Sequence, residues 1–397
     1  MERRKFLFGI VALTALQLSS PLKAINSKEP LLQQKRVPMK VKDVQILELL
    51  GKNKSKANYI KVLTDSGSEG LYGPIDNEAV LMVNSLFKKQ LIGQDPLAIE
   101  DFWQHIYTNN RHSRGSYYSI GMSAIDNVLW DLRGKYLDLP VFRLLGGGTR
   151  TKVRAYASCL GYSLEPPALQ ERAKSVLEQG FNHQKWFLTV NSSNMDSNSL
   201  DRNVEIVRLL RETVGSKSDL MFDASTAWDL SYAIEWAKRV EQYYPRWLEE
   251  PFQVARLESF KELSHETSVA IASGEHFYGR WDIQEFLNEK AIRVVQADPE
   301  WCGGVSELIK ICNIASVYGA QVIPHGHSML AAMHVVASQP EMICPLVEFL
   351  ILKMTGDYQY FDKNPVIPQN GMITLSERPG FGIELDDSKI ENMRIVS

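Results

Sequence analysis

Short apolar runs, each closed by an acidic residue or a histidine, recur through residues 220–349 and constrain the fold more than any other feature of the chain. Longer segments with helical periodicity separate them, which is typical of βα units around a parallel sheet. A single acid after a strand is explained by a helix N-cap or a turn. Six polar ends in order instead indicate a barrel with its chemistry at the C-terminal strand ends. These ends are Asp223, Glu249 with Glu250, Glu275 with His276, Asp298, His325 and Glu348.

A smaller α+β region precedes this barrel. Residues 41–50 and 59–64 predict strands joined by a polar hairpin, and a glycine-rich loop is expected to residue 74. Helices are expected at 77–90, 98–107 and 121–136. Residues 370–385 have turn and strand character and predict a return of the chain to the first region. We therefore expect an export signal and linker at 1–38, a small domain built from 39–150 and 356–397, and a barrel at 151–355.

Composition and charge indicate which class of molecule this protein binds. The 397 residues are 44% hydrophobic, enough for a full core, and the net charge of -3 gives no electrostatic footprint for nucleic acid. A small-molecule partner is expected. The cysteines lack CxxC spacing and lie in or beside apolar patterns, so buried free thiols are expected rather than a disulfide framework or a zinc site. They are Cys159, Cys302, Cys312 and Cys344.

The N-terminus reads as an export signal. A basic start, with Arg3 and Arg4 followed by Lys5, precedes an apolar run too short to span a bilayer comfortably. The arginine pair resembles the twin-arginine signal, so we expect a periplasmic protein with no stable membrane span after signal removal. The alternatives are an N-terminal membrane anchor and a cytoplasmic protein with a hydrophobic leading helix.

Three carboxylates on consecutive strand ends predict a metal site. Asp223, Glu249 and Glu275 would lie side by side on the barrel rim, where uncompensated anions at close range are unfavourable. A divalent cation resolves this, and hard oxygen ligands suit Mg²⁺. The alternative is a rim ion network in which these carboxylates pair with Lys or Arg.

A carboxylate and a histidine on the next two strand ends predict an acid–base pair. Asp298 and His325 end the sixth and seventh strands, within hydrogen-bond reach if the strands are adjacent. A carboxylate on one imidazole nitrogen fixes the tautomer and raises the basicity of the other. His325 is therefore a candidate general base, although a histidine before Gly326 could also be a plain turn residue.

In combination, these motifs resemble the enolase superfamily, mandelate racemase subgroup. The matching positions are Asp223, Glu249 in WLEEP, Glu275 in SGEH, the Asp298 and His325 pair, and Glu348 in VEF. The segment SAIDNVLWDLRGKYLDLPVFRLLGG is similar to the family's capping-domain helix, and SGEHFYGRW, QADPEWCGGVSELIKI and VIPHGHS are similar to L-rhamnonate dehydratase-like acid sugar dehydratases. The likeness spans residues 40–385. It implies an α/β fold in which an α+β capping domain, formed by N- and C-terminal segments, covers a modified (β/α)₇β barrel.

The resemblance also implies a reaction. It is the Mg²⁺-dependent dehydration of a sugar acid (an aldonate) through an enediolate, with loss of the β-hydroxyl to give a 2-keto-3-deoxy acid. His325, oriented by Asp298, would remove the proton beside the carboxylate. Lys185 and a protonated Glu348 would stabilise the charge on the substrate carboxylate, and Lys185, His276 and Glu348 would contact the substrate. A homo-oligomer is expected.

Two departures from the family pattern keep alternatives open. Many relatives carry Lys-x-Lys on the second barrel strand, but this chain has Lys185, Trp186 and Phe187, and a phenyl ring cannot move a proton. The first capping loop also lacks the histidine of the rhamnonate enzymes. The alternatives are an epimerase or racemase of a hydroxy acid, which needs a second base, and a non-catalytic exported carbohydrate-binding protein.

Overall fold

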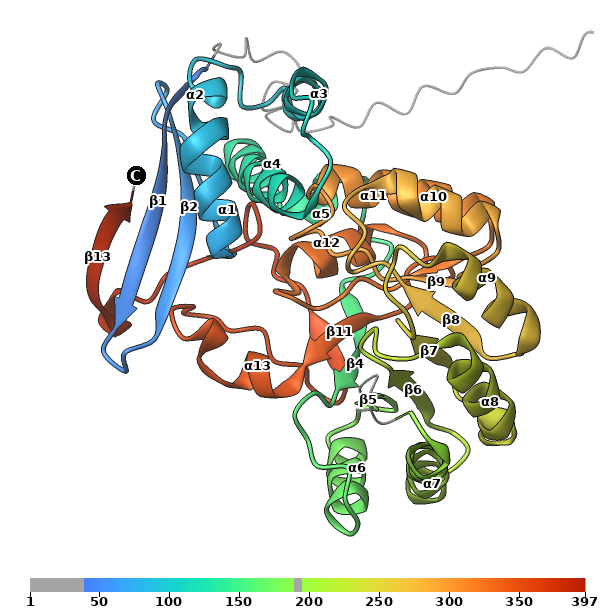
Figure 1. The fold of residues 1–397 in the computed structure, drawn as a ribbon. Helices are drawn as coiled ribbons and strands as arrows, with labels where there is room; N and C mark the ends of the chain where they lie inside the picture. The colour runs from blue at the N-terminus through green and yellow to red at the C-terminus, as the bar shows by residue number, and fades with distance from the viewer. Residues whose placement is uncertain (1–38, 189–194, 397) are drawn as a thin grey trace, which may run out of the picture. The chain divides into compact units, whose positions relative to one another are not determined.

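The computed structural model describes residues 39–188 and 195–396, which belong to one compact unit (Figure 1). The expected export signal and linker at 1–38 lie outside the described residues. Within the described part, every helix is too short or too polar to cross a membrane.

Both ends of the described chain meet in one antiparallel sheet. Its strand order is β13-β1-β2-β3, with β1 at Val41–Gly51, β2 at Lys56–Thr64, β3 at Glu69–Ile75 and β13 at Ile390–Val396. The last strand pairs with the first, as Figure 1 shows at the edge of the sheet. The expectation that the capping domain draws on both ends of the chain is confirmed.

The capping-domain helices follow β3 in the chain. They are α1 (Asn77–Met82), a π-helical turn η2 (Val83–Phe87), α2 (Lys88–Leu91), α3 (Ile99–Asn109), α4 (Ser116–Leu137) and α5 (Val141–Leu144). Of these, α2 and α4 pack against the strands of the sheet. The expected helices are confirmed, with α4 starting five residues earlier than the expected 121. The expectation of a loop to residue 74 is wrong, because β3 occupies most of it. One of the glycines that suggested a loop has a packing role: a Cβ at Gly70 would lie 2.5 Å from the carbonyl oxygen of Val128 in α4.

Eight parallel strands form the barrel sheet, in the order β10-β9-β8-β7-β6-β5-β4-β11. They are β4 (Lys152–Ser158), β5 (His183–Phe187), β6 (Asp219–Asp223), β7 (Trp247–Glu249), β8 (Ala270–Ser273), β9 (Val294–Val295), β10 (Gln321–Val322) and β11 (Val347–Leu350). The connecting helices are α6 (Ala168–Glu178), α7 (Ser197–Val214), α8 (Leu230–Val240), α9 (Leu257–Glu266), α10 (Arg280–Asn288), α11 (Val305–Val317) and α12 (Leu330–Ser338). Seven βα units and a final strand confirm the predicted (β/α)₇β fold.

The chain after β11 crosses back to the capping domain. A short helix, α13 (Ile351–Thr355), follows β11, and β12 (Met372–Thr374) pairs antiparallel with β4. The backbone N–H of Phe381 then donates to Oδ1 of Asp131 in α4 at 2.9 Å. The predicted return of residues 370–385 is therefore confirmed at its second half, whereas its first half stays with the barrel.

Side chains of α4 hold the chain that follows β9. Oδ1 of Asn127 accepts from the backbone N–H of Val305 at 3.1 Å, and Oδ2 of Asp126 accepts from that of Ser306 at 2.9 Å. These groups lie in the first turn of α11, whose backbone N–H groups have no partner within the helix. The capping helix therefore caps a barrel helix and fixes the segment that begins at Asp298.

All four cysteines lie in the described residues, and each is a buried free thiol, as expected.

Candidate active site

Strand register places the first two predicted metal ligands beside each other. Asp223 pairs with Phe187 on one side and with Glu249 on the other, at the carboxyl ends of β5, β6 and β7. Glu249 is fully buried, and one of its oxygens accepts from the indole N–H of Trp247 at 3.0 Å. Glu275 follows β8 by two residues. The three carboxylates thus end consecutive strands, as the sequence predicted.

One lysine lies among these acids. Nζ of Lys185 is paired with Oε1 of Glu249, lies 2.9 Å from Oε1 of Glu348 and 3.4 Å from Oδ2 of Asp223. The lysine is 1% exposed. Burial alone would lower its pKa, but Glu249 and Glu348 outweigh burial and hold the pKa well above its usual value. The ion network that stood as the alternative to a metal site is therefore present at two of the three predicted ligands.

A single ammonium cannot compensate all of this negative charge. Burial raises the pKa of Asp223, Glu249 and Glu275 above their usual values, and their mutual repulsion adds to that rise. Three carboxylates, two of them buried and the third, Glu275, half-buried, have under-compensated ionised forms and so fit a hard divalent cation. The residues present are therefore compatible with Mg²⁺.

The predicted acid–base pair is formed. Nδ1 of His325 lies 2.7 Å from Oδ2 of Asp298, so the N–H at Nδ1 donates to the carboxylate. Nε2 of His325 lies 3.7 Å from Oε2 of Glu275. Burial lowers the pKa of His325, but Glu275 and Asp298 outweigh burial and raise it to about 10. Asp298 is 1% exposed, so its hydrogen bond holds the imidazole from the buried side of His325.

The surroundings of Glu348 favour its ionised form over the expected protonated one. Burial raises its pKa, but the charges of Lys185 and His325 outweigh burial and lower the pKa to about 2. Oε2 of Glu348 also accepts from the backbone N–H of Gly326 at 3.0 Å. A Cβ at residue 326 would lie 2.7 Å from the carbonyl oxygen of Glu348, so glycine permits this close approach.

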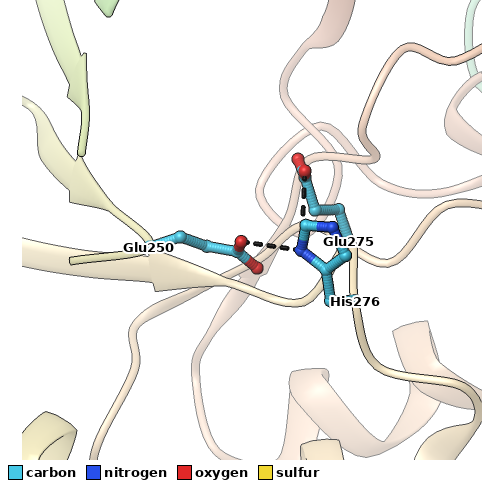
Figure 2. A group of neighbouring side chains, drawn as sticks. All are labelled: Glu250, Glu275 and His276. Atoms are coloured by element: carbon cyan, nitrogen blue, oxygen red, sulfur yellow. Dashed lines mark hydrogen bonds and ion pairs between the residues drawn. The ribbon is translucent and has the colours of Figure 1, made fainter. Parts of the chain in front are cut away.

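A second carboxylate–imidazole pair, Glu250 and His276, lies beside Glu275 (Figure 2). Nδ1 of His276 lies 2.8 Å from Oε2 of Glu250 and 3.6 Å from Oε1 of Glu275. Glu250 is 3% exposed and also accepts from Oγ of Ser273 at 3.2 Å. One ligand atom from each of Glu250, Glu275 and His276 lies within 4.8 Å of the others, so they form another group that could hold a metal ion. Sequence reasoning gave Glu250 no role, although its place beside Glu249 at a strand end was a signal.

The predicted residues surround one cavity of about 270 Å³. Most of them line it: Lys185, Asp223, Glu275, His276, His325 and Glu348. Glu249 and Asp298 lie behind this lining, fully or almost fully buried. Phe187 supplies an apolar wall at the position where many relatives carry a lysine.

Two further residues at this site were missed from sequence. The indole of Trp301 stacks on the imidazole of His325, with ring centroids 4.9 Å apart. The backbone N–H of His327 donates to Oδ2 of Asp298 at 3.1 Å. Both residues lie within motifs already singled out, but nothing in a single sequence indicated that they would flank the His325–Asp298 pair.

The family of the chain follows from comparison with known proteins. Residues 53–146 match the mandelate racemase/muconate lactonizing enzyme N-terminal domain, and residues 168–389 match the enolase C-terminal domain-like family. The chain belongs to the mandelate racemase/muconate lactonizing enzyme family of the enolase superfamily, and it is an enzyme of that superfamily.

Particular relatives show how far the likeness extends. The chain is 30% identical to an arabinonate dehydratase of Saccharolobus solfataricus over 338 residues, which cover 83% of this chain and 87% of that protein. It is 26% identical to a D-galactarolactone cycloisomerase of Agrobacterium fabrum, covering 85% and 90%. Among solved structures, the 3,6-anhydro-D-galactonate cycloisomerase of Zobellia galactanivorans superposes with a TM-score of 0.76 at 25% identity, covering 89% of this chain and 100% of that one.

Proposed function

We propose that this enzyme is a Mg²⁺-dependent dehydratase of a sugar acid, which converts an aldonate to a 2-keto-3-deoxy acid. The observation that carries the proposal is the 2.7 Å hydrogen bond between His325 and Asp298, with the other ring nitrogen turned toward Glu275 in a cavity of acids. The likeness to an arabinonate dehydratase over most of both chains supports a sugar acid as the substrate class.

Asp223, Glu249 and Glu275 are the proposed ligands of the cation. The support is their place on consecutive strand ends and their under-compensated charge. When bound, Mg²⁺ would offset this charge and act as a Lewis acid on the substrate carboxylate, which is worth several kcal/mol as the enediolate develops. Glu250 and His276, with Glu275, are the other candidate set.

His325 is the proposed base. Its Nδ1–H is engaged by Asp298, so Nε2 is the nitrogen that exchanges a proton with the substrate. The charge of Glu275 helps to hold the pKa of His325 at about 10, and a cation on Glu275 would offset that charge and favour the neutral imidazole with its lone pair on Nε2. Nε2 takes the proton from the carbon beside the carboxylate, and the electron pair of that C–H bond forms the enediolate. The bond from the next carbon to its hydroxyl then breaks, and the imidazolium returns its proton to the leaving oxygen, which departs as water. The enol tautomerises to the 2-keto-3-deoxy acid.

Lys185, Glu348 and His276 have supporting roles in this proposal. Lys185 stays charged and lines the cavity, so it can offset negative charge on the substrate carboxylate. Glu348 stays ionised, and through Gly326 it anchors the loop that carries the base. His276, held at Nδ1 by Glu250, presents its other ring nitrogen for a substrate hydroxyl.

Epimerisation or racemisation is the second candidate function. It needs a proton donor on the opposite face of the carbon, and Phe187 cannot serve. His276, with Glu250 at 2.8 Å, is the observation that favours this alternative, because it places a second imidazole beside Glu275.

A panel of sugar acids tests the proposal. Arabinonate and other pentonates and hexonates are incubated with the full-length enzyme, with Mg²⁺ and with EDTA. A 2-keto-3-deoxy product formed only with Mg²⁺ is the expected result. Inverted acids without dehydration would instead indicate an epimerase, and binding without turnover would indicate a carbohydrate-binding protein.

Two further expectations stay proposals of the same kind. The leading residues, with Arg3 and Arg4, would direct export to the periplasm, and the enzyme would assemble as a homo-oligomer. Light scattering of the purified enzyme tests the second of these.

A further inference from the structure

Asp76 stands where a helix-capping residue is expected but does not cap its helix. It is the N-cap residue of α1, and an Asp there usually accepts from a backbone N–H of the first turn. No such bond is formed by its side chain. Both carboxylate oxygens instead reach barrel residues: Oδ1 lies 2.8 Å from Nε2 of His327, and Oδ2 accepts from the indole N–H of Trp301 at 2.9 Å.

Trp301 connects Asp76 to the proposed base, because it bonds to Asp76 and stacks on His325. Its indole lies 4.9 Å from the imidazole of His325, centroid to centroid, with 30° between the ring planes. The indole N–H is the one polar handle of this side chain, so the bond to Asp76 sets how the ring lies over His325.

His327 connects Asp76 to the His325–Asp298 pair by a second route. Because Nε2 faces an anion at Asp76, it carries the proton, and Nδ1 accepts from Nζ of Lys353 at 3.0 Å. The backbone N–H of His327 donates to Oδ2 of Asp298 at 3.1 Å, the same oxygen that accepts from His325. A fixed His327 therefore fixes the carboxylate that orients the base.

We propose that Asp76 is a positioning residue for the reaction: it holds Trp301 and His327, and through them it sets the orientation of the His325–Asp298 pair. The capping domain thereby takes part in aligning a base that belongs to the barrel. The inference rests on the proposed function of His325. It assigns Asp76 no contact with the substrate.

The variants Asp76→Asn and Asp76→Ala test this positioning role, with the best substrate of the aldonate panel. Asparagine keeps one oxygen acceptor and alanine keeps none, so the effect should be graded. We expect kcat, and the rate of α-proton exchange in D₂O, to fall by about 10-fold for Asn and about 100-fold for Ala, since small misplacements carry costs of this order. KM should stay within about twofold, because substrate contacts are retained.

A matched control and a double-mutant cycle separate positioning from general stability. Asp65 is also in the capping domain, and its Oδ1 accepts from the backbone N–H of Lys40 at 2.9 Å. Asp65→Asn should match the wild type in kcat. Trp301→Phe removes one of the two hydrogen bonds that Asp76→Ala removes, so the double variant Asp76→Ala/Trp301→Phe should lose less than the product of the two single losses.

Several outcomes would overturn the inference. They are a kcat of wild-type size in Asp76→Ala, multiplicative losses in the double variant, and a lowered Tm with unchanged exchange. If Asp76→Ala does not fold, the near-isosteric Asp76→Asn decides by the same measurements. Failure of the proposed function would give a different result from failure of this inference. In that case the wild type would exchange no α-proton, or His325→Asn would still exchange it.

Discussion

His325 and Asp298 are joined by a 2.7 Å hydrogen bond between Nδ1 and Oδ2, which leaves Nε2 on the side of Glu275 at 3.7 Å. The bond determines which nitrogen exchanges a proton with a substrate, because the anion holds the N–H at Nδ1 and leaves Nε2 as the position that can lose and regain one. Asp298 is almost fully buried and cannot turn away to water. The pair is thus a fixed element of the site, while its role in proton transfer is open to test.

His325→Asn should lose both dehydration and exchange of the α-proton with solvent deuterium. General base catalysis contributes about 10²- to 10⁴-fold, so turnover should fall by an amount in that range when no other group replaces the imidazole. Proton NMR in D₂O measures the exchange directly. Persistent exchange in this variant would assign the base to another residue, of which His276 is the nearest candidate.

The metal ligands can be assigned by comparing two sets of variants. Asp223→Asn, Glu249→Gln and Glu275→Gln should each abolish Mg²⁺-dependent turnover and weaken Mg²⁺ binding in titration calorimetry. Glu250→Gln should bind Mg²⁺ nearly as the wild type does. The reverse pattern, with binding lost in Glu250→Gln and kept in Asp223→Asn, would assign the cation to the cluster in Figure 2. Full activity in EDTA would remove the metal from the mechanism.

Lys185→Met should destabilise the enzyme strongly in EDTA. The substitution leaves Glu249 and Glu348 buried without their cation, and breaking a buried pair in this way costs about 3–5 kcal/mol. Mg²⁺ should recover part of this loss, so the metal-induced rise in Tm should be larger in the variant than in the wild type. Equal rises would show that Lys185 and the cation do not compensate the same acids.

The control for this prediction is Lys261→Met. Lys261 pairs with Glu289 at 2.5 Å, but both side chains are more than a third exposed. A surface pair contributes about 0–1 kcal/mol, so thermal unfolding should hardly change, with or without Mg²⁺.

The next prediction concerns residues 1–38, which lie outside the described part of the structure. A reporter fused to residues 1–40 should leave the cytoplasm only when Arg3 and Arg4 are both present. Substitution of the pair by lysine should leave the reporter in the cytoplasm, as cell fractionation would measure. Export that ignores the substitution would contradict the twin-arginine assignment.

Local pattern was enough to predict the strand ends but not what surrounds them. Asp223, Glu249 and Glu275 follow apolar runs whose periodicity reports burial, so their place on one rim follows from the barrel alone. The role of Asp76 could not be read in this way. It is 225 residues from Trp301 in the chain, and its local signal, an acid before a helix, is that of an ordinary N-cap.

Two differences from the sequence expectations, at β3 and at Glu348, have similar physical causes. The segment that became β3 looked like a loop because it is rich in glycine, but close packing of α4 requires glycine at residue 70. The charge of Glu348 depends on Lys185, two strands away in the sheet order, and no single-residue pattern predicts the balance between burial and that ion pair.

Stability should fall in mild acid because of one buried histidine. His334 is fully buried; its Nδ1 accepts from the backbone N–H of Phe142 at 3.2 Å, and its Nε2 has no partner in the described structure. Burial lowers the pKa of His334 from 6.5 to about 3. Because the pKa of His334 is lower in the folded state, the unfolded chain takes up a proton at a higher pH than the folded chain does. The contribution of His334 to the free energy of unfolding is therefore complete above pH 6.5 and is lost progressively toward pH 3.

His334→Asn, which keeps an acceptor near the position of Nδ1 and cannot be protonated, tests this account. Between pH 7 and pH 5 the wild type should lose about 2 kcal/mol of unfolding free energy that the variant keeps, by proton linkage. Urea unfolding at both pH values measures the difference. The surface variant His265→Asn should retain the wild-type dependence on pH, since His265 is exposed. Parallel pH dependence in the wild type and His334→Asn would show that other groups govern the loss.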